Sequence, residues 1–268
     1  MPTYRGTAHL REAIASVLVQ SFTRFELIIV DDDSPDETAS IAASYNDPRI
    51  RLVRNTARLG AEGNWNRCLA LATGKYFKLL PQDDILAPTC LEQQVAVLDD
   101  DASERLAFVF CARSIIDARA KQLMVRRYPG GDTGVVPANR LARRCVRYGT
   151  NLIGEPGGVL FRRAVAAAVG AFDASLPYLI DLDYWIRLLK MGDAYYLHQP
   201  LVSFRVSPGS WSVAIGAEQS REFRRFIDRI RKTTDFGIGP IDIAAGNVMA
   251  RANNRLRMLI YRLVLRQR

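Results

Sequence analysis

The sequence has little of what a zinc site, a disulfide framework or a membrane-spanning helix requires. It contains four cysteines and two histidines, and the cysteines are scattered without a Cys-x-x-Cys pair. This pattern argues against zinc-binding and disulfide-stapled proteins. No run approaches the roughly 18–20 consecutive apolar residues of a transmembrane helix, and no signal-peptide pattern opens the chain. We therefore expect a protein of the reducing cytoplasm.

The positive charge is concentrated at the C-terminal end. The chain of 268 residues has a net charge of +9, and residues 221–268 contain twelve Arg or Lys and four Asp or Glu. A nucleic-acid-binding surface usually adds aromatic stacking residues or a recognisable module, and neither is evident. We therefore expect no nucleic-acid partner, and an anionic membrane surface is the better candidate for the basic end.

Two apolar runs each end in a cluster of carboxylates. Residues 25–30 are followed by aspartates 31–33, and residues 76–80 are followed by Asp83 and Asp84. Apolar runs without alternation are typical of strands buried on both faces in a parallel sheet, whose ligands bind beyond the carboxyl ends of the strands. Both clusters are therefore predicted to face one crevice. Converging carboxylates favour a cation or many hydrogen-bond donors at such a site.

Helical and strand-like segments alternate along the first 117 residues. We expect helices at residues 7–19, 36–45, 62–72 and 87–98, and strands at residues 25–30, 49–54, 76–80 and 106–116. This alternation predicts a doubly wound α/β sheet. The later pattern is less regular, with a hairpin or loop at 122–132, helices at 138–147 and 182–191, strands at 156–161 and 195–204, and a helical tail interrupted at 237–240.

Six segments, in this order and spacing, resemble the family 2 glycosyltransferases, inverting enzymes of the GT-A fold. They are PTYR, SVLVQSFTRFELIIVDDDSPDET, NTARLGAEGNW, GKYFKLLPQDD, GEPGGVLFRR and GAFDASLPYLIDLDYWIRLL. The resemblance covers roughly residues 2–210. It implies a Rossmann-like, mostly parallel sheet flanked by helices over residues 1–212, with a nucleotide-binding half to about residue 117 and an acceptor half from about residue 118. A basic helical extension, residues 213–268, follows.

The resemblance also implies an activity. The enzyme would move a hexose from a nucleotide-diphosphate sugar, with a UDP-sugar the expected donor, to an acceptor hydroxyl with inversion. A saccharide or lipid-linked acceptor would fit bacterial polysaccharide or glycolipid synthesis, with the protein cytoplasmic or peripheral on the inner face of the membrane. The sequence leaves the sugar, the acceptor, the linkage and the oligomeric state open.

The resemblance assigns nucleotide and metal contacts to the first acidic crevice. Asp32 matches the residue that accepts from the nucleobase ring N–H, and Pro2 and Tyr4 match contacts around the nucleoside. Asp83 and Asp84 match an acidic pair, of which Asp83 is expected at the ribose and Asp84 at a Mg²⁺ or Mn²⁺ ion that bridges the phosphates. The alternative for these three aspartates, and for Asp31 and Asp33 beside Asp32, is a polar turn or capping role.

Asp181 matches the catalytic base of the family. An inverting transfer needs one carboxylate to take the proton of the acceptor hydroxyl. Asp181 also fits an N-cap of the following helix, and Asp183 is a second candidate. The residue before the base is usually Glu in the family, but it is Ile180 in this chain.

Other assignments are weaker matches. Arg205 or Ser207 would contact the phosphates, since Ser207 stands where many relatives have histidine. Glu155, in a Gly-rich loop, and Asp183 are further candidates for acceptor contacts. The family also has a strand before the PTYR segment, and five to seven added apolar residues upstream of Met1 are expected to stabilise the protein.

The C-terminal segment of residues 255–268 has an apolar helical face. That face is formed by Leu256, Leu259, Ile260, Leu263 and Val264. Such a helix either lies in a membrane interface or packs its apolar face on the catalytic domain.

Two other functions compete with transfer. A non-catalytic nucleotide-sugar-binding scaffold of the same fold would explain the departures at Ile180 and Ser207. A nucleotidyltransferase would need a Gly-rich, basic triphosphate loop, and residues 3–10 contain one Arg and one Gly.

Overall fold

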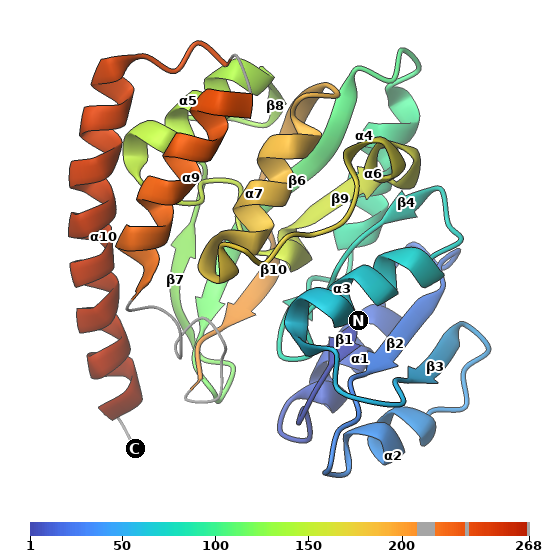
Figure 1. Ribbon diagram of the computed structural model, residues 1–268. Coiled ribbons are helices and arrows are strands. Elements are labelled where there is room, and N and C mark those ends of the chain that lie inside the picture. The colour runs from blue at the N-terminus through green and yellow to red at the C-terminus, as the bar shows by residue number, and fades with distance from the viewer. Residues whose placement is uncertain (208–217, 234–235, 267–268) are drawn as a thin grey trace.

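The computed structural model describes residues 1–207, 218–233 and 236–266. Its N-terminal part is a three-stranded parallel sheet in the order β1-β2-β3, shown in blue in Figure 1. The strands are β1 (Pro2–Thr3), β2 (Leu27–Asp31) and β3 (Ile50–Arg54), and the helices are α1 (Leu10–Leu18), α2 (Thr38–Ala43) and α3 (Gly60–Leu71). All five residues of β2 are buried, as its unbroken apolar sequence predicts.

The second sheet has seven strands and is mixed. Its order is β4-β9-β6-β10-β5, with β7 paired to β6 and β8 paired to β10. Strands β6 and β10 are parallel, and the other pairings are antiparallel. The strands are β4 (Tyr76–Phe77), β5 (Ile85–Leu86), β6 (Leu106–Ile116), β7 (Gln122–Arg126), β8 (Gly134–Val136), β9 (Val159–Arg162) and β10 (Asp193–Arg205). The predicted α/β class is confirmed, with a mixed rather than mostly parallel second sheet.

Helices cover this sheet and continue into the tail. They are α4 (Cys90–Asp100), α5 (Ala138–Tyr148), α6 (Arg163–Val169), α7 (Ile180–Leu188), α9 (Gln219–Thr233) and α10 (Pro240–Arg266), with 3₁₀ turns at Pro156–Gly158 and Pro177–Leu179. The sequence did not predict β1, β5, β8 or α6, which are short. The strand predicted at residues 76–80 is shorter in the structure, where β4 has only two residues. Within the described ranges, no helix has the length and hydropathy needed to cross a membrane.

A row of aromatic side chains fixes α7 against the centre of the second sheet. The Trp185 ring lies 6.2 Å from that of Phe108 on β6, and the Tyr184 ring is stacked on Phe172 at 3.8 Å. These side chains are fully buried. The start of α7, which carries Asp181, is therefore held rigidly over the sheet.

The C-terminal helix packs on the rest of the protein. A Cβ at Gly246 would lie 2.3 Å from the backbone oxygen of Val146, and one at Gly149 would lie 2.3 Å from the nitrogen of Ala250, so α5 and α10 touch backbone to backbone. Of the predicted apolar face, Leu256 and Leu259 are 57% and 53% exposed. The side chains of Ile260, Leu263 and Val264 lie outside the described residues. The packing alternative therefore describes the first part of α10.

Two carboxamide side chains join the N-terminal part to the second sheet. Gln82 accepts from the backbone N–H of Tyr4 and donates to its carbonyl, both at 2.9 Å. Asn66 on α3 makes the same pair of bonds to Phe172, at 3.0 and 2.8 Å. We call these two contacts the amide clamps. They connect two sheets that do not share a strand.

A cavity of about 750 Å³, with apolar residues on its inner side and charged residues at its rim, lies between β2 and β4. It is lined by residues of both strands, including Ile28 and Phe77, and by Met1. The amino group of Met1 donates to the carbonyl of Ile28 at 2.6 Å, so the chain enters β1 at the end of this cavity. An extended apolar segment placed before Met1 would therefore fill it.

Five to seven apolar residues added before Met1 are expected to stabilise the protein. Two or three buried side chains, less the entropy of ordering the segment, would add roughly 2 kcal/mol, or roughly 4–8 °C in Tm for a protein of this size. Thermal unfolding followed by circular dichroism would measure the shift. An extension of Ser and Gly of equal length is the control, and equal Tm values for the two extensions would contradict the prediction.

Candidate active site

One cavity of about 680 Å³ brings most of the predicted site together. Its wall includes Asp32 from the end of β2, Asp83 from the loop after β4, and Asp181 from the start of α7. The three segments are far apart in the sequence. The carboxyl ends of β2 and β4 direct the first two to this opening, and α7 brings Asp181 to it. The prediction that both acidic clusters face one crevice is confirmed.

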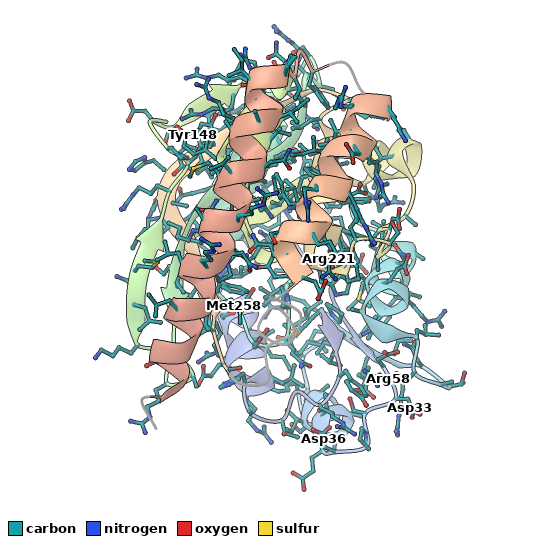
Figure 2. The ribbon with its side chains drawn as sticks, turned by 60° about the vertical axis from the view of Figure 1, so that its left-hand side comes forward. Asp33, Asp36, Arg58, Tyr148, Arg221 and Met258 are labelled. Atoms are coloured by element: carbon teal, nitrogen blue, oxygen red, sulfur yellow. The ribbon has the colours of Figure 1, made fainter. Side chains whose placement is uncertain are left out.

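The side of the cavity where the nucleoside is expected is built on β1. Pro2 and Tyr4 line it as expected, and an amide clamp fixes the Tyr4 backbone. The guanidinium of Arg58 lies 4.1 Å from the centre of the Tyr4 ring, and Arg58 also lines the cavity. Figure 2 labels Arg58 in the N-terminal part of the protein. A flat aromatic ring beside a guanidinium is suited to a base or a phosphate.

Asp32 is the member of the aspartate triplet that lines the cavity. Its carboxylate accepts from the backbone N–H of Leu59 at 2.7 Å and of Gly60 at 2.9 Å, and from the Asn55 amide at 2.9 Å. Asp31 is buried and accepts from the Ser34 N–H, whereas Asp33 pairs with exposed Arg54. The turn-and-cap alternative therefore describes Asp31 and Asp33. Asp32 combines a structural role with a place on the wall.

The acidic pair is split between the wall and the interior. Asp83 lines the cavity, but Asp84 is fully buried and does not. One oxygen of Asp84 accepts from the backbone N–H of Arg205 at 3.1 Å, and the other has no hydrogen-bond partner among the described residues. Burial, and next the charge of Asp83, raise the pKa of Asp84 well above its usual value. A buried carboxylate oxygen without a donor is a feature that a cation would satisfy.

The oxygen ligands present fit Mg²⁺ or Mn²⁺. These hard cations prefer carboxylates, water and phosphate oxygens, and they are often bound by one or two carboxylates plus substrate phosphates. Within the described residues, no group of three His, Cys, Asp or Glu side chains could hold a metal alone. Asp84, which the resemblance assigns to the metal, would hold the ion together with the donor diphosphate, and Asp83, which it assigns to the ribose, lies beside it on the wall and would supply a second carboxylate.

Asp181 has the environment of a general base. It is the second residue of α7 rather than its N-cap, which is Leu179. One carboxylate oxygen accepts from the Leu182 N–H at 2.7 Å, and the other accepts from the Asn151 amide at 2.9 Å. Burial first, and the charge of Glu155 second, raise the pKa of Asp181 to about 7. A base with this pKa is suited to proton transfer near neutral pH.

Asn151 organises this side of the site, and it was not predicted from the sequence. Besides holding Asp181, its side chain accepts from the N–H groups of Ile153 and Gly154 and donates to the Gly154 carbonyl. Gly154 has a φ of +115° and lies against the Arg113 guanidinium. Both the backbone conformation and the close approach require glycine at this position. The neighbouring Glu155 lines the cavity and forms an ion pair with Arg113. Glu155 is thus at the site, as expected.

Three predicted contact residues do not line the cavity. Arg205 is fully buried, where its guanidinium donates to the carbonyl of Asp83 and pairs with Glu12, so it supports the acidic loop from behind. Asp183 forms an ion pair with Arg187 within α7 and another with Arg229 that joins α7 to α9. Ser207 is buried beside the part of the chain that the structure does not describe. The expected phosphate or acceptor contacts of these three are not supported by this geometry.

The sequence also missed the residues that α10 contributes to the wall. Asn253, Leu256 and Arg257 line the cavity together with Tyr178 and the β7 residue Arg126. The only signal in the sequence was the apolar face of the tail. Such a face predicts that the helix packs on the protein, but it does not predict the surface on which the helix packs. The tail is therefore part of the site and not a separate appendage.

Comparison with known proteins agrees with this geometry. The family described as Glycosyl transferase family 2 matches residues 1–170. An uncharacterized glycosyltransferase of Rickettsia prowazekii is 31% identical over 212 residues, which are 77% of this chain and 62% of that protein. The chain thus spans less than two thirds of that relative.

Two solved structures share the fold. The TarS 1–349 structure from S. aureus in complex with UDP has a TM-score of 0.68 at 17% identity, over 91% of this chain and 68% of that chain. The mannosyltransferase PcManGT from Pyrobaculum calidifontis, in complex with GDP-Man and Mn²⁺, has a TM-score of 0.63 at 18% identity, over 98% and 72%. The fold is that of the GT-A glycosyltransferases. The chain belongs to glycosyl transferase family 2, as the sequence segments predicted.

Proposed function

We propose that the protein transfers a hexose from a nucleotide-diphosphate sugar to an acceptor hydroxyl with inversion. The observation that carries this proposal is the shared cavity, in which the carboxylate of Asp181 and the acidic residue Asp83 line one space. The complexes of neighbours with UDP and with GDP-Man and Mn²⁺ support a nucleotide-sugar donor. We further propose a UDP-sugar donor and a role in cell-surface polysaccharide or glycolipid synthesis, at the inner face of the membrane.

The two halves of the catalytic domain are expected to bind different substrates. We propose that residues 1 to about 117 bind the nucleotide, with Asp32, Pro2 and Tyr4 around the nucleoside. Residues from about 118 to 212 would bind the acceptor, and Asp181 would take the proton of its hydroxyl as the oxygen attacks the anomeric carbon. The sugar–phosphate bond breaks on the opposite face, and the nucleoside diphosphate leaves. A Mg²⁺ or Mn²⁺ ion at Asp83 and Asp84 would neutralise the charge of the diphosphate.

The test is release of nucleoside diphosphate from a panel of UDP-, GDP- and dTDP-sugars with Mg²⁺ or Mn²⁺. Metal-dependent release from one donor would support the enzyme and identify its nucleotide. Donor binding without release, with a panel of saccharide and lipid-linked acceptors present, would favour the scaffold instead.

The pH dependence of transfer is expected to follow Asp181. The base acts as the carboxylate, so kcat/KM should fall about tenfold per pH unit below the pKa of about 7. Glu155→Gln removes a charge that raises this pKa, so the acid limb should move to lower pH. Exposed Glu62→Gln is the control. An acid limb that stays in place in Glu155→Gln, with the fold intact by circular dichroism, would contradict this origin of the pKa.

A further inference from the structure

Helix α3 forms the part of the cavity wall that leads from Asp32 toward α7. Its first residue, Gly60, donates its backbone N–H to Asp32 at 2.9 Å. The α3 residues that line the cavity lie on one face of the helix, and they are Gly60, Ala61, Asn64 and Trp65. The Trp65 ring lies 5.5 Å from that of Phe172, and Phe172 is stacked on Tyr184 of α7. Among these four residues, Trp65 is therefore the one that reaches α7.

Trp65 is held rigidly on this wall. Its ring is nearly perpendicular to that of Phe172, at 86°, so the two rings meet edge to face. The preceding residue, Asn64, donates to the Val30 carbonyl at 3.0 Å. The following residue, Asn66, forms the amide clamp with Phe172. Trp65 itself is half-buried and lines the cavity, and a ring held in this way loses little freedom when a ligand packs on it.

The proposed reaction places the donor hexose close to the start of α7. The diphosphate is expected at Asp83 and Asp84, and the anomeric carbon must lie within reach of the acceptor oxygen whose proton Asp181 takes. The hexose therefore lies between the Asp83 loop and α7. Asp83, Asp181 and Trp65 line one cavity, and Trp65 is connected to α7 through Phe172. Trp65 is thus placed to contact the transferred sugar.

An indole ring suits the sugar better than it suits the diphosphate. A pyranose ring carries its hydroxyl groups around the rim, and its faces expose C–H groups that are weakly positive. The face of an aromatic ring is apolar and carries negative partial charge, so it attracts these C–H groups and shields them from water. The same negative face repels an anion. The chemistry of the Trp65 side chain therefore favours a sugar ring as its ligand.

We propose that Trp65 is the stacking platform for the hexose of the nucleotide-sugar donor. The proposal rests on the proposed function and adds to it a residue that contacts the transferred sugar. Such a contact raises the affinity for the nucleotide sugar relative to the nucleoside diphosphate, which is the product. Trp65 would therefore help the enzyme to distinguish its donor from its product.

The test compares each nucleotide sugar with its own nucleoside diphosphate. Calorimetric titrations with Mg²⁺ and without acceptor would measure Kd for UDP-glucose, UDP-N-acetylglucosamine and UDP, and for GDP-mannose and GDP. For the nucleotide sugar that binds the wild type best, Trp65→Leu should raise Kd about fivefold, the size of a good stacking contact, and leave Kd of the nucleoside diphosphate unchanged. Trp65→Phe keeps an aromatic face and should stay within about twofold of the wild type.

Arg67→Gln is the matched control, because Arg67 is exposed on the same helix. Circular dichroism and Tm would establish that each variant is folded. Equal weakening of the nucleotide sugar and the nucleoside diphosphate by Trp65→Leu would place Trp65 at the nucleotide and overturn the proposal. Unchanged affinity for both would make Trp65 a packing residue, which also overturns it. Failure of every nucleotide sugar to bind the wild type, with UDP or GDP bound, would instead overturn the proposed function and this inference with it.

Saturation-transfer NMR would locate the contact on the ligand. In the wild type, the ring C–H protons of the hexose should receive more saturation, relative to the anomeric proton of the ribose, than they do in Trp65→Leu. The ribose proton serves as the internal reference, because both proteins are expected to bind the nucleoside in the same way. An unchanged ratio of the two signals would contradict stacking, even with a lower affinity in the variant.

Discussion

Replacing Asp181 by asparagine is expected to reduce the transfer rate by a factor of roughly 10²–10⁴, the usual contribution of a general base. Asparagine has nearly the same shape and can still accept from the Leu182 N–H, but it cannot take a proton from the acceptor. The loss should appear in kcat, with the affinity for the donor little changed. Steady-state release of nucleoside diphosphate in the presence of acceptor would measure it.

The stability of the same variant provides a control with a defined sign. The pKa of Asp181 is raised from 3.8 to about 7 in the folded protein, so its stabilising effect is fully present below pH 4 and is lost as the pH rises through 7. Asparagine lacks this titration. The free energy of unfolding of the variant, minus that of the wild type, should therefore increase between pH 4 and pH 7. Wild-type activity in a folded Asp181→Asn protein would exclude Asp181 as the base.

Replacing Asp84 by asparagine is expected to reduce metal-dependent transfer by roughly a hundredfold or more. A divalent ion supplies several kcal/mol of charge stabilisation to a leaving diphosphate, and each 1.4 kcal/mol is a factor of ten. The asparagine keeps an acceptor for the Arg205 N–H, and it removes a buried carboxyl whose oxygen has no donor among the described residues. The fold should therefore survive, within a few degrees in Tm.

Asp83→Asn is the companion variant, because Asp83 lies on the wall and Asp84 behind it. Both should need more Mn²⁺ for half-maximal activity, which a titration of the metal would measure. If Asp84 only capped the loop, Asp84→Asn would transfer at the wild-type rate with an unchanged metal requirement. That result would remove Asp84 from the proposed metal site.

The sequence predicted the N-terminal half well because its signals are local. The strand before Asp32 and the long strand β6 are continuous apolar runs, and such runs specify buried strands without help from distant residues. The two acidic clusters were found by their place after the strands, whereas Asp181 was found through the resemblance to the family. The elements that were missed, β1, β5, β8 and α6, are two to seven residues long and are stabilised by pairing or packing with distant segments.

The errors at the site have a different cause. Arg205 and Asp183 have side chains that suit substrate contacts, but the structure uses both to connect elements far apart in the sequence. No pattern along the chain distinguishes a charge that faces a cavity from one that closes an ion pair in the interior. Asn151 was missed for the same reason, because its value lies in four hydrogen bonds to the surrounding backbone and to Asp181.

The amide clamps have a consequence for how a ligand binds. Gln82 and Asn66 together make four hydrogen bonds across the two parts of the protein, and each is worth about 0.5–1.5 kcal/mol net. Widening the cavity would break these hydrogen bonds. Their summed net free energy is a large part of a typical free energy of folding. The distance between the N-terminal part and the second sheet is therefore set before any ligand arrives. A preorganised cavity of this kind loses little conformational entropy on binding, and it discriminates by size because it cannot adapt at low cost.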